Sequence, residues 1–405
     1  MLYNAYELQR SAFLPWSIWA QANVNLLSFP YSALAYAPLT KAMAAGNELL
    51  LRVTKRYDKP AFGLHETLVE GEKVAVSEAV VLEKPFCKLL HFARATQRAD
   101  PVVLLVAPLS GHHATLLRDT VRAMLPDHDV YITDWVDARL VSLREGPFHL
   151  DDYVAYVQEF IRHLGPELHV VAVCQPVVAV LAAVSLLAVA EPPACPRSMT
   201  LMSGPIDPRR GPTAVTELAK EKPLRWFKDN LIQRVPAQYP GFLRLVYPGF
   251  VQHAAFMAMN PERHLTAYRA FFDHLVEGDN DSAEAHRKFY DEYNAVIDLP
   301  AEFYLDTVAT VFQRHSLPKG EMFVRGVRVV PEAISGTALF TVEGELDDIS
   351  GPGQTQAAHD LCRSIPASMR QHLVAEGVGH FGIFSGRRYR EQIYPQIRDF
   401  IRQQS

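Results

Sequence analysis

Residue types able to carry out nucleophilic catalysis occur at three separate places in this sequence, each beside a strand-like run. Cys174 lies in HVVAVCQPVVAV, between an apolar strand-like stretch and an apolar helix-like stretch. Asp347 follows ALFTVEGE, and His380 follows RQHLVAEGVG. Nucleophile, acid and base in this chain order, each in a loop after a strand, form a known arrangement for acyl transfer. The pattern predicts Cys174 as nucleophile, His380 as general base and Asp347 as the carboxylate that orients it.

The surroundings of Cys174 fit a nucleophile elbow in part. An elbow holds its central residue in a strained, positive-φ turn, which needs small neighbours. Ala172 can replace the usual first glycine, and Pro176 can occupy the first turn of the following helix. The positive end of that helix would favour a thiolate. Unpaired cysteines are also among the most buried residue types, so a purely structural Cys174 is the alternative.

The acid of the proposed triad has two adjacent candidates, Asp347 and Asp348. We expect Asp347, because it lies closer to the end of the strand. Fifteen other histidines compete with His380, but none follows a strand-like run in the same way.

The turn after PVVLLVAPL lies where an α/β hydrolase supplies one N–H of its oxyanion hole. The second N–H comes from the residue after the nucleophile, here Gln175. We therefore expect the backbone amides of Gln175, Leu109 and Ser110 to hold the oxyanion. Without the triad, the turn would fit a plain strand-to-helix connection equally well.

Alternating strand and helix signals extend from Pro101 to about Gly204. Near-continuous apolar runs such as VVLLVA and HVVAV are typical of buried parallel strands, and helix-like segments separate them. This pattern predicts an α/β fold: a mostly parallel sheet with helices on both faces. Strand-like sequence returns at residues 338–348 and 370–380.

Three regions follow from this pattern. Residues 1–75 look mostly helical and are expected to form an N-terminal extension, which either packs on its own domain or binds a surface. Residues 76–210 and 327–405 are expected to form the α/β-hydrolase core. The helical, aromatic-rich residues 211–326 are expected to form a cap inserted into that core.

Composition excludes several classes of function. The 405 residues carry 40 basic and 45 acidic side chains, with a formal net charge of −5 and no basic stripe for nucleic acid. The longest uncharged apolar run, Val170–Ala190, is divided by Gln175-Pro176, which argues against a transmembrane segment. The cysteines have neither CxxC nor zinc-site spacing and indicate a reducing compartment; they are Cys87, Cys174, Cys195 and Cys362.

The N-terminus also bears on location. Glu7, Gln9 and Arg10 interrupt its apolar residues, so it does not have the pattern of a secretion signal. We therefore expect a cytoplasmic protein.

Several motifs together resemble the intracellular polyhydroxybutyrate depolymerases, which belong to the α/β-hydrolase superfamily. These motifs are MLYNAYELQR, APLSGHHATLLRDTV, AVCQPVVAVLAAV, VEGELDDISGPGQT and GVGHFGIFSG. The resemblance runs nearly end to end, and its most specific element is Cys-Gln-Pro. It implies that the triad of that family falls on Cys174, Asp347 and His380. It also implies hydrolysis of stored polyester to 3-hydroxybutyrate oligomers and monomer.

The resemblance further implies a polyester granule as partner and a location at its surface in the cytoplasm. No cofactor or metal is expected, although coenzyme A could accept the acyl group in place of water. The sequence leaves open whether the chain forms a homo-oligomer. Candidate contacts to the polymer are His112, Trp226, Phe227, Tyr247 and Phe250.

Two other functions fit the same residues. A polyester synthase or thioesterase would use the same triad on hydroxyacyl-CoA. A non-catalytic protein would only bind granules through its apolar N-terminus and cap. Activity on amorphous polymer that depends on Cys174 distinguishes both from a depolymerase.

Overall fold

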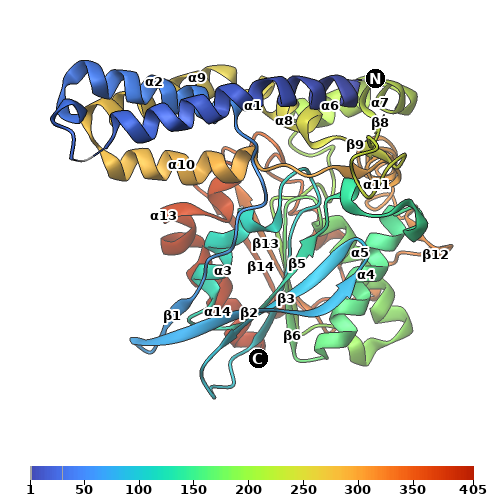
Figure 1. Ribbon diagram of the computed structural model, residues 1–405. Coiled ribbons are helices and arrows are strands. Elements are labelled where there is room, and N and C mark those ends of the chain that lie inside the picture. Colours follow the sequence, from blue (N-terminus) through green and yellow to red (C-terminus); the bar gives the residue numbers. More distant parts are fainter. Residues whose placement is uncertain (1, 30) are drawn as a thin grey trace.

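The computed structural model describes residues 2–29 and 31–405 and has a nine-stranded sheet at its centre (Figure 1). Three antiparallel strands form one edge, and the next six strands are parallel to one another. In spatial order the strands are β1 (Glu66–Val69), β2 (Glu72–Lys84), β3 (Cys87–Arg94), β5 (Asp129–Trp135), β4 (Val102–Val106), β6 (Leu168–Val173), β7 (Ser198–Met202), β13 (Ala338–Gly344) and β14 (Arg370–Ala375).

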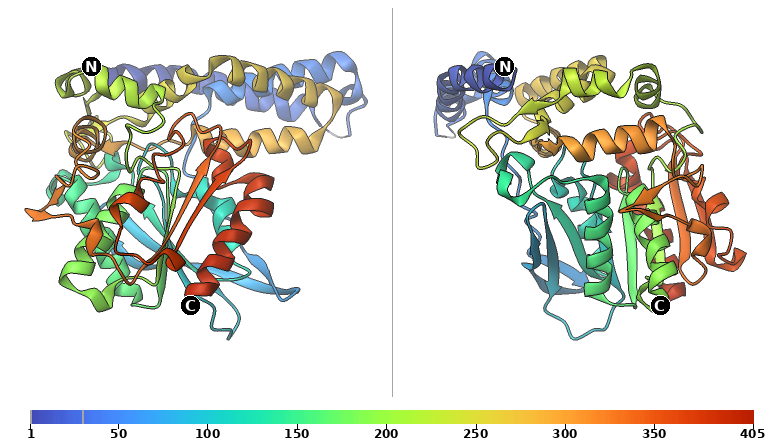
Figure 2. Two further views of the ribbon diagram at one scale, coloured as in Figure 1. Left: turned by 180° about the vertical axis from the view of Figure 1, so that it is seen from behind. Right: turned by 90° about the vertical axis from the view of Figure 1, so that its right-hand side faces the viewer.

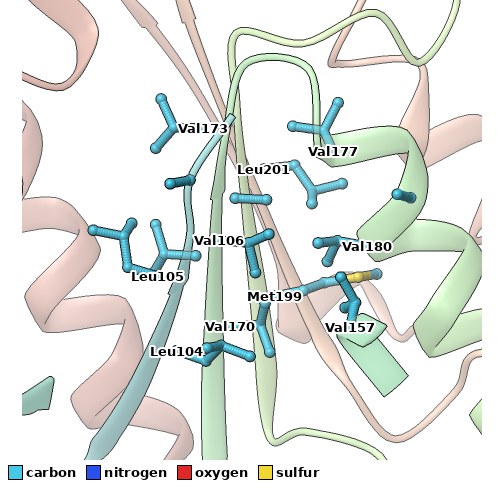
Figure 3. Packing of buried hydrophobic residues seen from close by; sticks show 14 of the residues in the cluster. Leu104, Leu105, Val106, Val157, Val170, Val173, Val177, Val180, Met199 and Leu201 are labelled. Carbon is cyan, nitrogen blue, oxygen red and sulfur yellow. The ribbon is translucent and has the colours of Figure 1, made fainter. Parts of the chain in front are cut away.

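Helices cover both faces of this sheet. On one face lie α3 (Arg118–Met124) and α14 (Tyr394–Gln404), and on the other lie α4 (Leu150–Leu164) and α5 (Val177–Ala190) (Figure 1). The apolar strands are buried because helices pack on each side of them. Figure 3 shows this packing, with Val106, Val170 and Leu201 of the sheet beside Val180 of α5 and Val157 of α4. The architecture is the predicted α/β-hydrolase fold.

The cap follows β7 and lies over one end of the sheet (Figures 1 and 2). It is largely helical, but it also contains a three-stranded antiparallel sheet that sequence analysis did not predict. Its elements are α6 (Ala214–Glu221), α7 (Leu224–Leu231), β8 (Gln233–Arg234), β9 (Leu245–Tyr247), α8 (Gly249–Met259), α9 (Pro261–Glu277), α10 (Asn280–Asn294), β10 (Leu299–Pro300) and α11 (Ala301–Thr307). The hairpin of β11 (Phe323–Val324) and β12 (Val327–Arg328) spans the expected boundary at residue 326.

The N-terminal extension is a pair of helices, α1 (Leu2–Leu27) and α2 (Pro38–Thr54). Its helical part ends at Thr54, so the expectation of mostly helical structure up to residue 75 is wrong for the last part. Residues 66–69 form β1, and residue 75 lies inside β2, which pairs with β1. Both helices lie on the side of the molecule that carries the cap (Figures 1 and 2).

Two short helices complete the core: α12 (Ala358–Leu361) follows β13, and α13 (Gly386–Arg388) precedes α14. No helix in the described ranges is long and apolar enough to cross a membrane.

Candidate active site

Cys174 occupies a sharp turn between β6 and α5. Its φ is +68°, in the left-handed region that residues other than glycine rarely adopt. Two backbone hydrogen bonds hold the turn: Cys174 N–H donates to Met202 O at 2.7 Å, and Val177 N–H donates to Cys174 O at 3.3 Å. A Cβ on Gly204 would lie 2.2 Å from Cys174 O, so only glycine fits beneath the turn. This is the geometry of a nucleophile elbow.

The structure brings the three residues of the predicted triad together. His380 Nε2 lies 3.2 Å from Cys174 Sγ, and His380 Nδ1 lies 2.8 and 3.0 Å from the two carboxylate oxygens of Asp347. A carboxylate can only accept, so Nδ1–H donates and Nε2 faces the sulfur. Cys174 is partly exposed, whereas His380 and Asp347 are each only 6% exposed.

The charges within this group support one another. Burial alone would lower the pKa of His380, but the neighbouring Cys174 and Asp347 outweigh it and raise that pKa well above its ordinary value. Burial alone would raise the pKa of Asp347, but His380 and two backbone N–H groups lower it overall. The site can therefore hold an imidazolium between the carboxylate of Asp347 and the sulfur of Cys174.

The second acid candidate points elsewhere. Asp348 is exposed and accepts a hydrogen bond from Asn260 Nδ2 of the cap at 3.1 Å. Asp347 Oδ1 also accepts the backbone N–H groups of Ile349 and Ser350, at 2.9 and 2.8 Å, which fix its orientation. The geometry thus favours Asp347, as expected.

The amides expected to form the oxyanion hole are available. The N–H groups of Gln175, Leu109 and Ser110 make no backbone hydrogen bond to another described residue. Gln175 follows the elbow directly, and Leu109 and Ser110 follow β4, which lies next to β6 in the sheet. Their role in holding an oxyanion stays a prediction.

A buried glutamate that sequence analysis did not single out ties the acid loop to the elbow. Glu343 of β13 accepts the N–H groups of Gly353, Thr355 and Gln356 at 2.6–2.9 Å. Thr355 Oγ1 in turn accepts Gly204 N–H at 2.8 Å and donates to Gly204 O at 2.9 Å. A glutamate within a strand-like run whose other residues carry no charge was the signal that could have identified it.

Three of the five expected polymer contacts are buried rather than exposed. His112 contacts Tyr293 O at 3.1 Å, and burial lowers the pKa of His112 to about 4. Phe227 packs in an apolar cluster of the cap, and the ring centroid of Tyr247 lies 4.2 Å from that of Tyr304. Burial removes these three side chains from the molecular surface, and a contact of any of them with polymer stays a prediction.

The other two candidates are partly exposed. Trp226 contacts Phe227 edge to face, and Phe250 stacks on Tyr6 of α1 at 3.9 Å between centroids. A contact of either residue with polymer stays a prediction.

A different aromatic group adjoins the triad. Phe381 is next to His380. Its ring centroid lies 5.9 Å from that of Tyr293 and 6.4 Å from that of Phe289, and both of these residues are on α10 of the cap. The group therefore lies where cap and core meet beside the reacting atoms. Sequence spacing gave no signal for it, because residues 289 and 381 belong to different regions of the chain.

Comparison with known proteins adds the family. A family model described as the C-terminus of PHB de-polymerase, where PHB is polyhydroxybutyrate, matches residues 203–405, half of the chain. The chain belongs to the PHB depolymerase family. The matched part contains Asp347 and His380 but begins after Cys174. With its α/β-hydrolase fold, this PHB depolymerase family member is an ester hydrolase.

Solved structures with similar folds are distant in sequence. One is a putative lipase from Acinetobacter baumannii, with 14% identity and a TM-score of 0.44, covering 82% of this chain and 93% of that chain. Another is DcsB in complex with a substrate analogue, with 13% identity and a TM-score of 0.47, covering 82% and 100%. A third is a putative non-heme bromoperoxidase from Mycobacterium tuberculosis, with 14% identity and a TM-score of 0.46, covering 84% and 98%. No curated protein matches the chain.

Proposed function

We propose that this PHB depolymerase family member hydrolyses amorphous poly(3-hydroxybutyrate) inside the cell with Cys174 as its nucleophile. The observation that carries the proposal is the continuous contact from Cys174 Sγ through His380 to Asp347. The family supplies the polyester as substrate, and the elbow supplies a sulfur held above the sheet.

The first half of the reaction forms a thioester. His380 takes the thiol proton, and Cys174 Sγ attacks the carbonyl carbon of an ester in the polymer. Backbone N–H groups of Gln175, Leu109 and Ser110 hold the resulting oxyanion. When the ester C–O bond breaks, His380 gives its proton to the leaving oxygen, which departs as the hydroxyl end of one polymer fragment.

The second half releases the acyl fragment. His380 removes a proton from water, the hydroxide oxygen attacks the thioester carbonyl, and the C–S bond breaks. The fragment leaves as a carboxylic acid that ionises at neutral pH, and the sulfur recovers its proton. Asp347 stabilises the imidazolium in both halves without taking its proton.

The proposed location follows from the substrate: the enzyme acts in the cytoplasm at the surface of storage granules. The proposal requires no cofactor, because thiol, imidazole and water supply every group that moves. Coenzyme A is a second acyl acceptor that the same thioester could use, and it would release an acyl-CoA.

The test compares wild type with Cys174→Ala on amorphous polyhydroxybutyrate particles, with and without coenzyme A. Released 3-hydroxybutyrate, oligomers and acyl-CoA are quantified by liquid chromatography. We expect release by wild type alone, and the product identifies the acceptor. Equal release by both proteins would eliminate Cys174 as nucleophile. Turnover of hydroxyacyl-CoA without turnover of polymer would identify an acyltransferase or thioesterase instead.

A further inference from the structure

Helix α1 presents its large apolar side chains to solvent. Its buried residues are Tyr3, Ser17 and Ala20, so the middle of the helix packs against the protein through small side chains. Trp16, Ile18 and Trp19 are 57%, 63% and 54% exposed. A helix that packs only on its own domain shows the opposite distribution. The outward apolar face of α1 consists of Phe13, Leu14, Trp16, Ile18, Trp19 and Leu26.

This apolar face is free of charge. Residues 11–40 contain no Asp, Glu, Lys, Arg or His. The two charged residues of α1 interact with the protein: Glu7 accepts a hydrogen bond from Tyr239 of the cap at 3.0 Å, and the Arg10 guanidinium lies 5.4 Å from the Tyr6 ring. Exposed apolar patches of this kind on a folded protein mark interaction sites.

Polar contacts attach the helical pair to the cap and so hold this face outward. Arg52 of α2 contacts Asp291 of α10 at 3.0 Å, and Glu48 of α2 pairs with Arg287 of α10 at 2.6 Å. The Tyr3 hydroxyl at the start of α1 donates to Asp298 at 2.7 Å. The helix is thus anchored at one end, and its partner helix is anchored to the cap, on the side of the molecule where the cap lies (Figures 1 and 2).

We propose that the apolar face of α1 binds the surface of the amorphous polyester particle and holds the enzyme on its insoluble substrate. This inference rests on the proposed function, because it takes its partner from the substrate. An aliphatic polyester is neutral and apolar, and it matches a face that has no charge. Helices that bind anionic membranes carry Lys and Arg at the interface, and this face has none.

The tryptophans favour polyester over a second copy of the chain. Trp16 and Trp19 contact each other edge to face, and no hydrogen bond among the described residues uses either indole N–H, although each indole has one donor. Ester carbonyls of the polymer are acceptors for such donors, whereas a second copy of this face would offer further donors. The amphipathic indole suits a boundary between an apolar phase and water.

The test separates binding from catalysis. All binding variants are made in the Cys174→Ala background, and their partition onto amorphous polyhydroxybutyrate particles is measured by co-sedimentation. The test variant is W16Q/I18Q/W19Q. The matched control, V189Q/V327Q, alters two apolar residues that are 57% and 56% exposed on the core and its hairpin. Burial of apolar area drives such adsorption, so we expect the test variant to partition at least about ten-fold less and the control to be unchanged.

Catalysis is measured with Cys174 intact. On a soluble 3-hydroxybutyrate oligomer, W16Q/I18Q/W19Q should turn over within about two-fold of wild type, because its site is unchanged; on particles it should lose activity in proportion to its partition. Soluble-substrate turnover also reports that the variant is folded. Absence of turnover by wild type on both substrates would refute the proposed function, while the partition measurement would still decide the role of α1.

Three results would overturn the inference. Unchanged partition of W16Q/I18Q/W19Q would show that α1 does not contact polymer. Equal binding of the Cys174→Ala protein to phosphatidylglycerol vesicles, lost at high salt, would indicate an anionic membrane as partner. A dimer in sedimentation velocity that W16Q/I18Q/W19Q dissociates would assign the face to a second copy.

Discussion

Replacement of Asp347 by Asn, compared with the same replacement of Asp348, tests which of these adjacent aspartates orients His380. Asp347 accepts from His380 Nδ1 at 2.8 Å and is almost fully buried, whereas Asp348 is exposed and accepts a hydrogen bond from Asn260 of the cap. In Asp347→Asn the amide nitrogen cannot accept a hydrogen bond. The imidazole then loses the partner that keeps its proton on Nδ1 and leaves Nε2 free to face the sulfur.

The structure sets the expected magnitude of the two effects. Asparagine in place of the acid of a catalytic triad lowers kcat by about 10⁴-fold in a well-studied protease, and each factor of ten corresponds to about 1.4 kcal/mol of activation free energy. We expect a loss of about 10³–10⁴-fold for Asp347→Asn. The loss of charge at a carboxylate that accepts two backbone N–H groups should also lower the free energy of unfolding by about 1–3 kcal/mol. Asp348→Asn should change kcat by less than about two-fold and stability by less than about 1 kcal/mol.

The assay is steady-state hydrolysis of a soluble 3-hydroxybutyrate oligomer, with urea unfolding of each variant as the control for folding. A KM close to that of wild type in Asp347→Asn would locate the defect in the chemical step. Equal losses in the two variants, or a larger loss in Asp348→Asn, would refute the assignment of the acid and the argument from His380 orientation.

Three further outcomes are expected. Stoichiometric iodoacetamide should inactivate the enzyme and label Cys174 but not Cys362, because burial raises the pKa of Cys362 to about 12; peptide mapping that finds Cys362 labelled first would contradict this. Glu343→Gln weakens the acceptor for three backbone N–H groups, so urea unfolding should show a loss of about 1–3 kcal/mol, and kcat should fall more than KM rises; unchanged kcat would remove Glu343 from the positioning of the acid loop. Burial beside Asp298 raises the pKa of Asp137 from 3.8 to about 7, so the native state keeps a proton that the unfolded chain loses, and stability falls as pH rises across that window. Urea unfolding of wild type and Asp137→Asn at pH 5 and pH 8 measures the difference between their free energies of unfolding. We expect that difference to move in favour of the variant at pH 8. A difference that does not change with pH would contradict the raised pKa of Asp137.

Local sequence was sufficient for the sheet and for the loops that carry the triad. Apolar runs such as Val102–Val106 and Leu168–Val173 need burial on both faces of the strand. Two layers of helices provide it, so such runs are typical of parallel strands in an α/β sheet. The chain order of Cys174, Asp347 and His380 then assigns each residue to the loop after its strand. The carboxyl ends of parallel strands meet at one edge of the sheet, so residues 206 positions apart come into contact.

Local sequence was not sufficient where burial depends on distant partners. The spacing of aromatic residues in the cap did not show that Phe227 is buried and Phe289 exposed. Whether a ring is covered depends on segments from elsewhere in the chain. The helix pattern likewise predicted too much helix before residue 75, where β1 pairs with β2 at one edge of the sheet.

The sequence by itself determined the fold class, the position of the elbow and the order of the proposed catalytic groups, because these depend on periodicity and on residues next to each strand. Only the tertiary structure decided which of Asp347 and Asp348 faces His380, and that Glu343 holds the acid loop. It also decided which side of α1 faces water. Each of these depends on contacts between segments far apart in the chain, which no local pattern encodes.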